Sequence, residues 1–323
     1  MGDATKRTSL EDELGPAAGR YFGFGYRQVM HEILRATPEA ATESPASAWT
    51  GCVIYPEGWS LNVDGTSREP HLSSVDAILL PLLALQHANP GGAGDHSLRQ
   101  RSVRTARLRA GGASWDDLDQ VPIHFNSAPA LLGEQGDEDV VARVGNIRVG
   151  LTLTGGEGPD AASDNCHGLG QLGSIYEGDY RRCWVESFVT DFDPHVLSLS
   201  STHVFASRVD GDRRPSPAVA PAGTTASIVD YLVTMGQLTQ ALVYRAHKST
   251  RSEVGNIWMR SLDIAIPARP LALPNQFQAV TRVAKDSVVC LGSRRMRTLQ
   301  VTSRASHGVV AVANLAYAAA DND

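Results

Sequence analysis

The chain has 323 residues, of which 42% are hydrophobic and 20% are charged. This composition is typical of a soluble globular protein with a substantial core, built as one large domain or two domains of ordinary size. The formal net charge of −6 argues against nucleic acid as the main partner, because nucleic-acid binding usually calls for a basic surface.

The sequence shows no pattern typical of a membrane or of an oxidising compartment. No apolar run is long enough to span a bilayer, and the opening segment MGDATKRTSLEDELG lacks the hydrophobic stretch of a secretory signal. The four cysteines lie far apart without metal-ligand spacing, which favours free thiols in a reducing compartment. We therefore expect a cytoplasmic protein with no membrane partner.

The first part of the chain predicts a buried helix set among strands. The helix begins at Ser73-Ser74-Val75-Asp76 and continues as an almost unbroken apolar segment to Gln86, with a kink expected at Pro81. Alternating and apolar runs predict strands around it. An aromatic turn or opening strand at Tyr21–Tyr26 is followed by strands at Trp49–Tyr55, Arg101–Arg109, Pro122–Phe125 and Val141–Leu153.

The second part repeats this pattern after a linker. Residues 154–173 are dense in glycine and small polar residues, and they separate a first half, residues 15–153, from a second half, residues 174–318. A second apolar helix begins at Ser227-Ile228-Val229-Asp230 and continues to Gln240. Strands are expected at Trp184–Thr190, Val196–Ser201, Ile257–Ile266, Val288–Leu291, Leu299–Thr302 and Val309–Asn314.

The two helix starts indicate a duplicated unit. Both match S-x-V-D, and they lie 154 positions apart. Because a helix that is apolar on every side must be buried on every side, each half is predicted to be an α+β unit in which one antiparallel sheet curls around a central helix. This is the hot-dog architecture, and two such units in tandem make a double hot dog.

Asp76 and Asp230 are the leading catalytic candidates, although both have a simpler interpretation. In each Ser-x-x-Asp start the carboxylate can cap the helix together with Ser73 or Ser227. The catalytic interpretation rests on the position of the two acids at helix N-termini. The free amides and positive partial charge there are suited to polarising an acyl carbonyl. A partly buried carboxylate there can have a raised pKa and act as a general base. One acid can cap its helix while the other acts in catalysis.

Two histidines could work with these acids. His71 directly precedes the first helix start, and His203 lies on a second-half strand that could face a cleft between the halves. No H-E-x-x-H, G-x-S-x-G, P-loop or dinucleotide-binding glycine pattern occurs, so we expect neither a metal nor a cofactor. The pair Cys166-His167 falls in the linker and is given no role.

Arginines are concentrated in two short runs of this acidic chain. Such clusters can recognise phosphate on coenzyme A, on a carrier-protein arm or on a sugar through bidentate hydrogen bonds. The alternative is a solvated strand face paired with nearby acids. The runs are Arg99, Arg101, Arg104, Arg107 and Arg109, and then Arg294, Arg295 and Arg297.

Several segments resemble the avirulence protein D (AvrD) family. The likeness extends over nearly the whole chain, from about Leu10 to about Tyr317. The segments that carry it are GPAAGRYFGFGY from Gly15 to Tyr26, PHLSSVDA from Pro70 to Ala77, LVY from Leu242 to Tyr244, and IWMR from Ile257 to Arg260.

The resemblance implies an enzyme of secondary-metabolite biosynthesis. AvrD-like proteins are associated with acyl glycosides of the syringolide kind, made by joining a β-ketoacyl group to a sugar-like polyol. They are similar to A-factor-type butyrolactone synthases, which have hot-dog domains and acylate a three-carbon phosphate. Hot-dog dehydratases, also similar, place a carboxylate on the central helix, which Asp76 and Asp230 match. The Gln that dehydratases place four residues later is Leu80 or Thr234 here, which argues against dehydration.

The sequence and the resemblance together predict acyl transfer and condensation on a double hot-dog fold. The expected donor is a β-ketoacyl thioester of coenzyme A or of an acyl carrier protein, and the expected acceptor is a small polyol or sugar. The alternatives are a dehydratase or thioesterase, and a non-catalytic module that binds a lipid-like ligand. The oligomeric state is open, with a homodimer among the options. Candidate catalytic residues are Asp76, Asp230, His71 and His203; candidate substrate-binding residues are Ser73, Ser74, Ser227, Arg104, Arg107 and Arg260.

Overall fold

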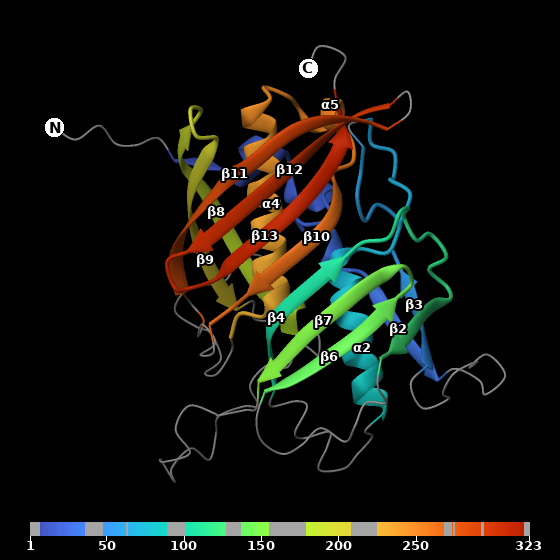
Figure 1. Cartoon of the computed structure of the whole chain (residues 1–323). Coiled ribbons are helices and arrows are strands. Elements are labelled where there is room, and N and C mark those ends of the chain that lie inside the picture. Colours follow the sequence, from blue (N-terminus) through green and yellow to red (C-terminus); the bar gives the residue numbers. More distant parts are fainter. Residues whose placement is uncertain are drawn as a thin grey trace, which may run out of the picture.

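The structure, a computed structural model, describes residues 7–35, 48–62, 64–88, 101–126, 137–154, 179–207, 225–267, 273, 275–291 and 294–319. Its strands form an antiparallel sheet of 13 strands in the order β1-β8-β9-β11-β12-β13-β10-β4-β7-β6-β5-β3-β2 (Figure 1). Few helices accompany this sheet. No helix among the described residues is both long and apolar enough to cross a membrane.

The strands are β1 (Thr8–Ser9), β2 (Met30–Arg35), β3 (Ala48–Ile54), β4 (Ser102–Arg109), β5 (Val121–Phe125), β6 (Glu138–Val144), β7 (Ile147–Thr154), β8 (Cys183–Asp193), β9 (Ser198–Ser207), β10 (Trp258–Ala265), β11 (Asn275–Leu291), β12 (Arg294–Ala305) and β13 (Val310–Ala318). The helices are α1 (Leu10–Leu14), α2 (Ser74–Ala88), α4 (Ile228–Ala246) and α5 (Arg251–Val254). Three short 3₁₀ helices are η1 (Ala17–Gly19), η2 (Gly25–Arg27) and η4 (Asp179–Arg181).

The sheet divides by chain order into two halves that meet at one strand pair. Strands β2 to β7 form one side and β8 to β13, with β1 at the edge, form the other. They are joined where β4 pairs with β10, from Arg109 opposite Ser261 to Thr105 opposite Ala265. Helix α2 contacts β2, β3, β4, β6 and β7, whereas α4 contacts β8 to β11 as well as β4 (Figure 1).

Both long helices are buried because their sequences are apolar around the whole circumference. In α2 every residue from Val75 to Leu82 is buried, and in α4 every residue from Ile228 to Met235 is buried. Helix α2 continues through Pro81, where the missing backbone N–H removes one intrahelical hydrogen bond. The two helix starts therefore occupy the interior, where an ionisable side chain has an unusual environment.

One predicted strand is instead a hairpin. The segment predicted as a single strand from Val141 to Leu153 contains the end of β6, a turn and most of β7, and the two strands pair with each other. The turn is made at Gly145, whose φ of 55° lies in the left-handed region that favours glycine. The predicted alternation in β7 is correct, since Ile147, Val149 and Leu151 are buried on one face. The apolar pattern identified the face but not the reversal of direction.

Two Tyr-Arg pairs exchange hydrogen bonds between the two parts of the chain. Tyr26-Arg27 ends η2 and Tyr180-Arg181 ends η4, at the same spacing of 154 positions that separates the helix starts. The Arg27 guanidinium donates to the Cys183 carbonyl oxygen, and Arg181 donates to the Val29 carbonyl oxygen. The two tyrosine rings are stacked with their centroids 6.2 Å apart. Such a reciprocal exchange is typical of two copies related by a two-fold axis.

We expect Arg27→Met and Arg181→Met to lower the unfolding free energy by similar amounts, about 1–3 kcal/mol each, because each leaves a carbonyl oxygen of the other half without its donor. Urea denaturation measures both values. Arg107→Met serves as the control, since Arg107 is exposed on β4, and it should change stability by less than about 0.5 kcal/mol. Unequal losses at Arg27 and Arg181 would argue against an equivalent role for the two pairs.

Candidate active site

A cavity of about 720 Å³ lies between α4 and strands β10, β12 and β13, and it reaches the start of α2. Most of its wall is apolar. Because these strands present alternate side chains to the interior, their inward residues and one face of α4 enclose the space. The apolar lining includes Leu232, Met235, Leu262, Ile264, Val301 and Leu315.

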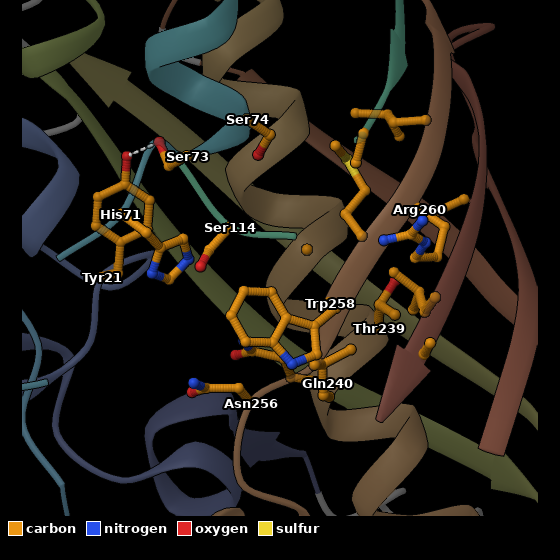
Figure 2. Close-up of a pocket in the computed structure, with 18 of the residues that line it drawn as sticks. Tyr21, His71, Ser73, Ser74, Ser114, Thr239, Gln240, Asn256, Trp258 and Arg260 are labelled. Carbon is orange, nitrogen blue, oxygen red and sulfur yellow. Dashed lines mark hydrogen bonds between the residues drawn. The ribbon is translucent and has the colours of Figure 1, made fainter. Parts of the chain in front are cut away.

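The polar end of the cavity is formed where α2 begins. His71, Ser73 and Ser74 line it, together with Tyr21 from the aromatic turn (Figure 2). The first backbone amides of a helix have no intrahelical acceptor and carry positive partial charge. Ser74, the first residue of α2, lines the cavity and provides one of these amides, so this end of the cavity suits a carbonyl oxygen that gains negative charge.

Asp76 is fully buried behind this polar end and holds several of its residues in place. Its carboxylate accepts hydrogen bonds from the Ser73 hydroxyl (2.6 Å), from the Ser73 backbone amide (2.9 Å) and from the Tyr55 hydroxyl. His31 on β2 lies 2.8 Å from the other carboxylate oxygen. Since the Ser73 proton is directed to Asp76, the Tyr21 hydroxyl must donate to Ser73 (Figure 2).

The pKa of Asp76 is lowered below its ordinary value. Burial raises this pKa, but the hydrogen bond and charge of His31 and the hydrogen bonds from Ser73 and Tyr55 outweigh burial. The carboxylate therefore stays ionised at neutral pH. It does not itself line the cavity, and it reaches the cavity through Ser73 and Tyr21.

His71 stands at the polar end between aromatic rings. Its ring centroid lies 5.3 Å from that of Trp258 and 6.5 Å from that of Trp59. The Tyr55 hydroxyl, which donates its one proton to Asp76, also lies 3.0 Å from the His71 carbonyl oxygen. His71 is partly exposed to the cavity and so is the ionisable side chain best placed to meet a substrate there.

Asp230 occupies the equivalent place on α4 but has a different environment. It forms a capping box with Ser227, while its Oδ1 atom is buried and has no hydrogen-bond partner among the described residues. Burial raises the pKa of Asp230 to about 6, against the opposing hydrogen bonds of Ser227, the charge of Arg27 and the thiol of Cys183. Neither Asp230 nor Ser227 lines the cavity.

His203 is also away from the cavity. Its ring nitrogens lie 2.7 Å from the Ser187 hydroxyl and 2.8 Å from the Ser201 hydroxyl, so both are satisfied. Burial, with a further contribution from His307, lowers the pKa of His203 to about 3. The ring is therefore neutral at physiological pH.

The three predicted substrate-binding arginines lie in different places. Arg104 is exposed on β4 and pairs with Asp137 at 3.1 Å, and Arg107 is exposed on the same face. Only Arg260 lines the cavity, on the strand side in Figure 2. Arg99 and the Cys166-His167 pair lie outside the described residues.

Several residues of this site were not predicted from the sequence. His31 and Tyr55 come from separate segments before α2, and Arg20, Arg68 and Arg251 line the cavity far from either predicted arginine run. The aromatic run at residues 21–26 was predicted as a turn or an opening strand, with no role in the site. Its tyrosine at position 21 gave one signal, because the hydroxyl of a buried tyrosine usually has a hydrogen-bond partner.

Several solved structures resemble this chain at low sequence identity. An acyl-CoA thioesterase II, TesB2, from Mycobacterium marinum shares 9% identity with a TM-score of 0.42, covering 90% of this chain and 96% of that chain. A conserved hot-dog protein of unknown function from Alicyclobacillus acidocaldarius shares 10% with a TM-score of 0.38, covering 87% and 96%. A 12:0-ACP thioesterase from Umbellularia californica shares 11% with a TM-score of 0.37, covering 92% and 99%.

The family assignment comes from the sequence. No curated protein sequence matches the chain. The family model described as "Pseudomonas avirulence D protein (AvrD)" matches residues 6–318. Since that match covers nearly the whole chain, the protein belongs to the AvrD family.

Proposed function

We propose that this protein transfers a β-ketoacyl group from a thioester to a hydroxyl group of a small polyol or sugar-like acceptor. The observation that carries the proposal is the cavity, which is apolar along α4 and the strands and polar where α2 begins. An acyl chain suits the apolar part, because each buried methylene group contributes about 0.8 kcal/mol. The donor is a thioester of coenzyme A or of an acyl carrier protein.

The same proposal includes the fold as a tandem double hot dog. Its halves are residues 15–153 and 174–318, separated by the linker of residues 154–173. One buried helix lies against the strands of each half. The reciprocal contacts of Tyr26-Arg27 and Tyr180-Arg181 support two related units.

The reaction uses one general base and one set of backbone amides that donate hydrogen bonds. A hydroxyl group of the polyol attacks the thioester carbonyl carbon, so that a C–O bond forms and the C–S bond breaks. The His71 imidazole takes the hydroxyl proton and returns it to the sulfur of the leaving thiolate, which departs as a thiol. The first amides of α2, at Ser74 and Val75, stabilise the negative charge on the carbonyl oxygen.

Asp76 acts in this scheme as a positioning residue. It fixes the Ser73 hydroxyl and the Ser73 backbone amide, which ties the segment before the helix to the carboxylate, and it accepts a hydrogen bond from Tyr55. His31 helps to keep the carboxylate ionised. The buried Asp76 carboxylate holds Ser73 and Tyr55 in one arrangement at the polar end of the cavity without contacting the substrate.

Incubation of the purified protein with β-ketoacyl thioesters and a panel of polyols tests the proposal, with the products read by mass spectrometry. The expected product is the acyl ester of a polyol, or that ester less one water after condensation. Free acid without ester would mean that water is the acceptor and that the protein is a thioesterase. An enoyl product would mean a dehydratase, and a retained ligand without turnover would mean a binding module.

A further inference from the structure

Three arginines gather at the end of the cavity near α5. Arg20, Arg68 and Arg251 line the cavity, and none of them forms an ion pair with any described residue. Arg20 is only 4% exposed. Charged side chains are rarely buried unless they are paired, so a group of three unpaired guanidinium ions beside a cavity is unusual.

Neutral groups hold these side chains in place and leave donors free. The Arg20 guanidinium donates to the Gln237 side-chain oxygen at 2.8 Å. Arg251 donates to the Gly19 carbonyl oxygen and to the Ser60 hydroxyl, both at 3.3 Å. Arg68 donates from one terminal nitrogen to Asn256, while its buried Nε has no hydrogen-bond partner among the described residues.

The three charges lie close enough to affect one another. Burial and then the charge of Arg251 lower the pKa of Arg20 to about 10, and burial and then the charge of Arg68 lower the pKa of Arg251. All three also act on the hydroxyl of Tyr244, near the end of α4. Glu69 lines the same cavity but is exposed and pairs with none of them. An anion bound among the arginines would relieve this repulsion.

We propose that Arg20, Arg68 and Arg251 bind a phosphate group of a substrate. Guanidinium groups bind phosphate oxygens through paired, charge-assisted hydrogen bonds. The phosphate is carried by the acyl donor, on coenzyme A or a phosphopantetheine arm, or by the acceptor, as a phosphorylated polyol. This inference rests on the proposed function, because it supplies a subsite for one of its two substrates. It moves phosphate recognition away from the exposed Arg104 and Arg107 on β4.

Two matched ligand pairs test the site by binding alone. 4′-Phosphopantetheine is compared with pantetheine for the donor, and dihydroxyacetone phosphate is compared with dihydroxyacetone for the acceptor. Trp59 and Trp258 line the cavity, so their fluorescence reports occupancy. In one pair the phosphorylated member should bind about 10- to 100-fold more tightly than its partner, and Arg68→Gln and Arg251→Gln should each remove most of this preference. The control Arg107→Gln should retain it.

Equal binding of both members of both pairs would overturn the inference. So would a phosphate preference that survives in both arginine variants when circular dichroism shows them folded. These experiments measure binding without turnover, so they test the phosphate site separately from the proposed reaction. Phosphate-dependent binding with no acyl ester among the products would support the phosphate site and contradict the proposed function. The pair that shows the preference identifies which substrate carries the phosphate.

Discussion

Replacing Asp76 with asparagine should lower kcat for acyl transfer about 100-fold, whereas the same change at Asp230 should leave kcat near the wild-type value. Asparagine keeps the size of Asp76 but loses the charge that fixes Ser73 and Tyr55. A misplacement of about 1 Å at the reacting groups costs about 10²-fold in rate. Asp230 caps α4, and neither it nor Ser227 lines the cavity.

Steady-state kinetics with a β-ketoacyl thioester and the best acceptor measures both variants. The KM for the donor should change little in Asp76→Asn, because the acyl chain is proposed to lie against the apolar wall formed by α4 and the strands, which Asp76 does not line. For comparison, His71→Ala removes the proposed general base and should lower kcat about 10²–10⁴-fold. A loss confined to Asp230→Asn, or equal losses in both variants, would place the reaction elsewhere than the start of α2.

The sequence predicts the two acids but not their surroundings. The pattern Ser-x-x-Asp before an apolar run is local, so it identifies both capping boxes. The partners that distinguish Asp76 are not local: Tyr55 comes from 21 positions earlier and His31 from 45. Nothing in a single sequence states which distant side chain lies against a helix start.

Strand β2, which supplies His31, was missed for a specific physical reason. Its apolar residues Met30 and Leu34 are 53% and 58% exposed, while the His31 side chain is buried against Asp76. The ordinary inside-outside pattern of a strand is therefore partly reversed there. Strands with regular alternation, such as β7 and β10, were found because their apolar faces are buried.

The proposed phosphate site illustrates the same limit. The sequence draws attention to arginines that are neighbours along the chain, as in β4. In a strand, however, successive side chains point to opposite faces, and these arginines are exposed to solvent. Arg20, Arg68 and Arg251 come from three separate segments, and only the fold brings them to one cavity. Residues that form one site can therefore lie far apart in the sequence, as these three arginines do.

The stability contributions of the two acids should change with pH in opposite directions. Its folded pKa, about 6, lies above the ordinary 3.8, so its contribution to stability is complete below about pH 4 and is lost as the pH rises through 6. A shift of about two units corresponds to about 3 kcal/mol. Asp230→Asn should therefore gain about 3 kcal/mol relative to wild type between pH 4 and pH 7.5.

For Asp76 the folded pKa lies below 3.8, so its contribution is present above about pH 4 and is lost as the pH falls through the folded value. Asp76→Asn should therefore be less stable than wild type at neutral pH, with a deficit that shrinks in acid. Urea denaturation of wild type and both variants at several pH values from about 2 to 7.5 measures these differences, since the change at Asp76 occurs below its ordinary pKa of 3.8. If the gain of Asp230→Asn did not depend on pH, Asp230 would be ionised with an ordinary pKa. The contrast between Asp76, whose pKa is lowered by its hydrogen-bond partners, and Asp230, whose pKa is raised by burial, would then be lost.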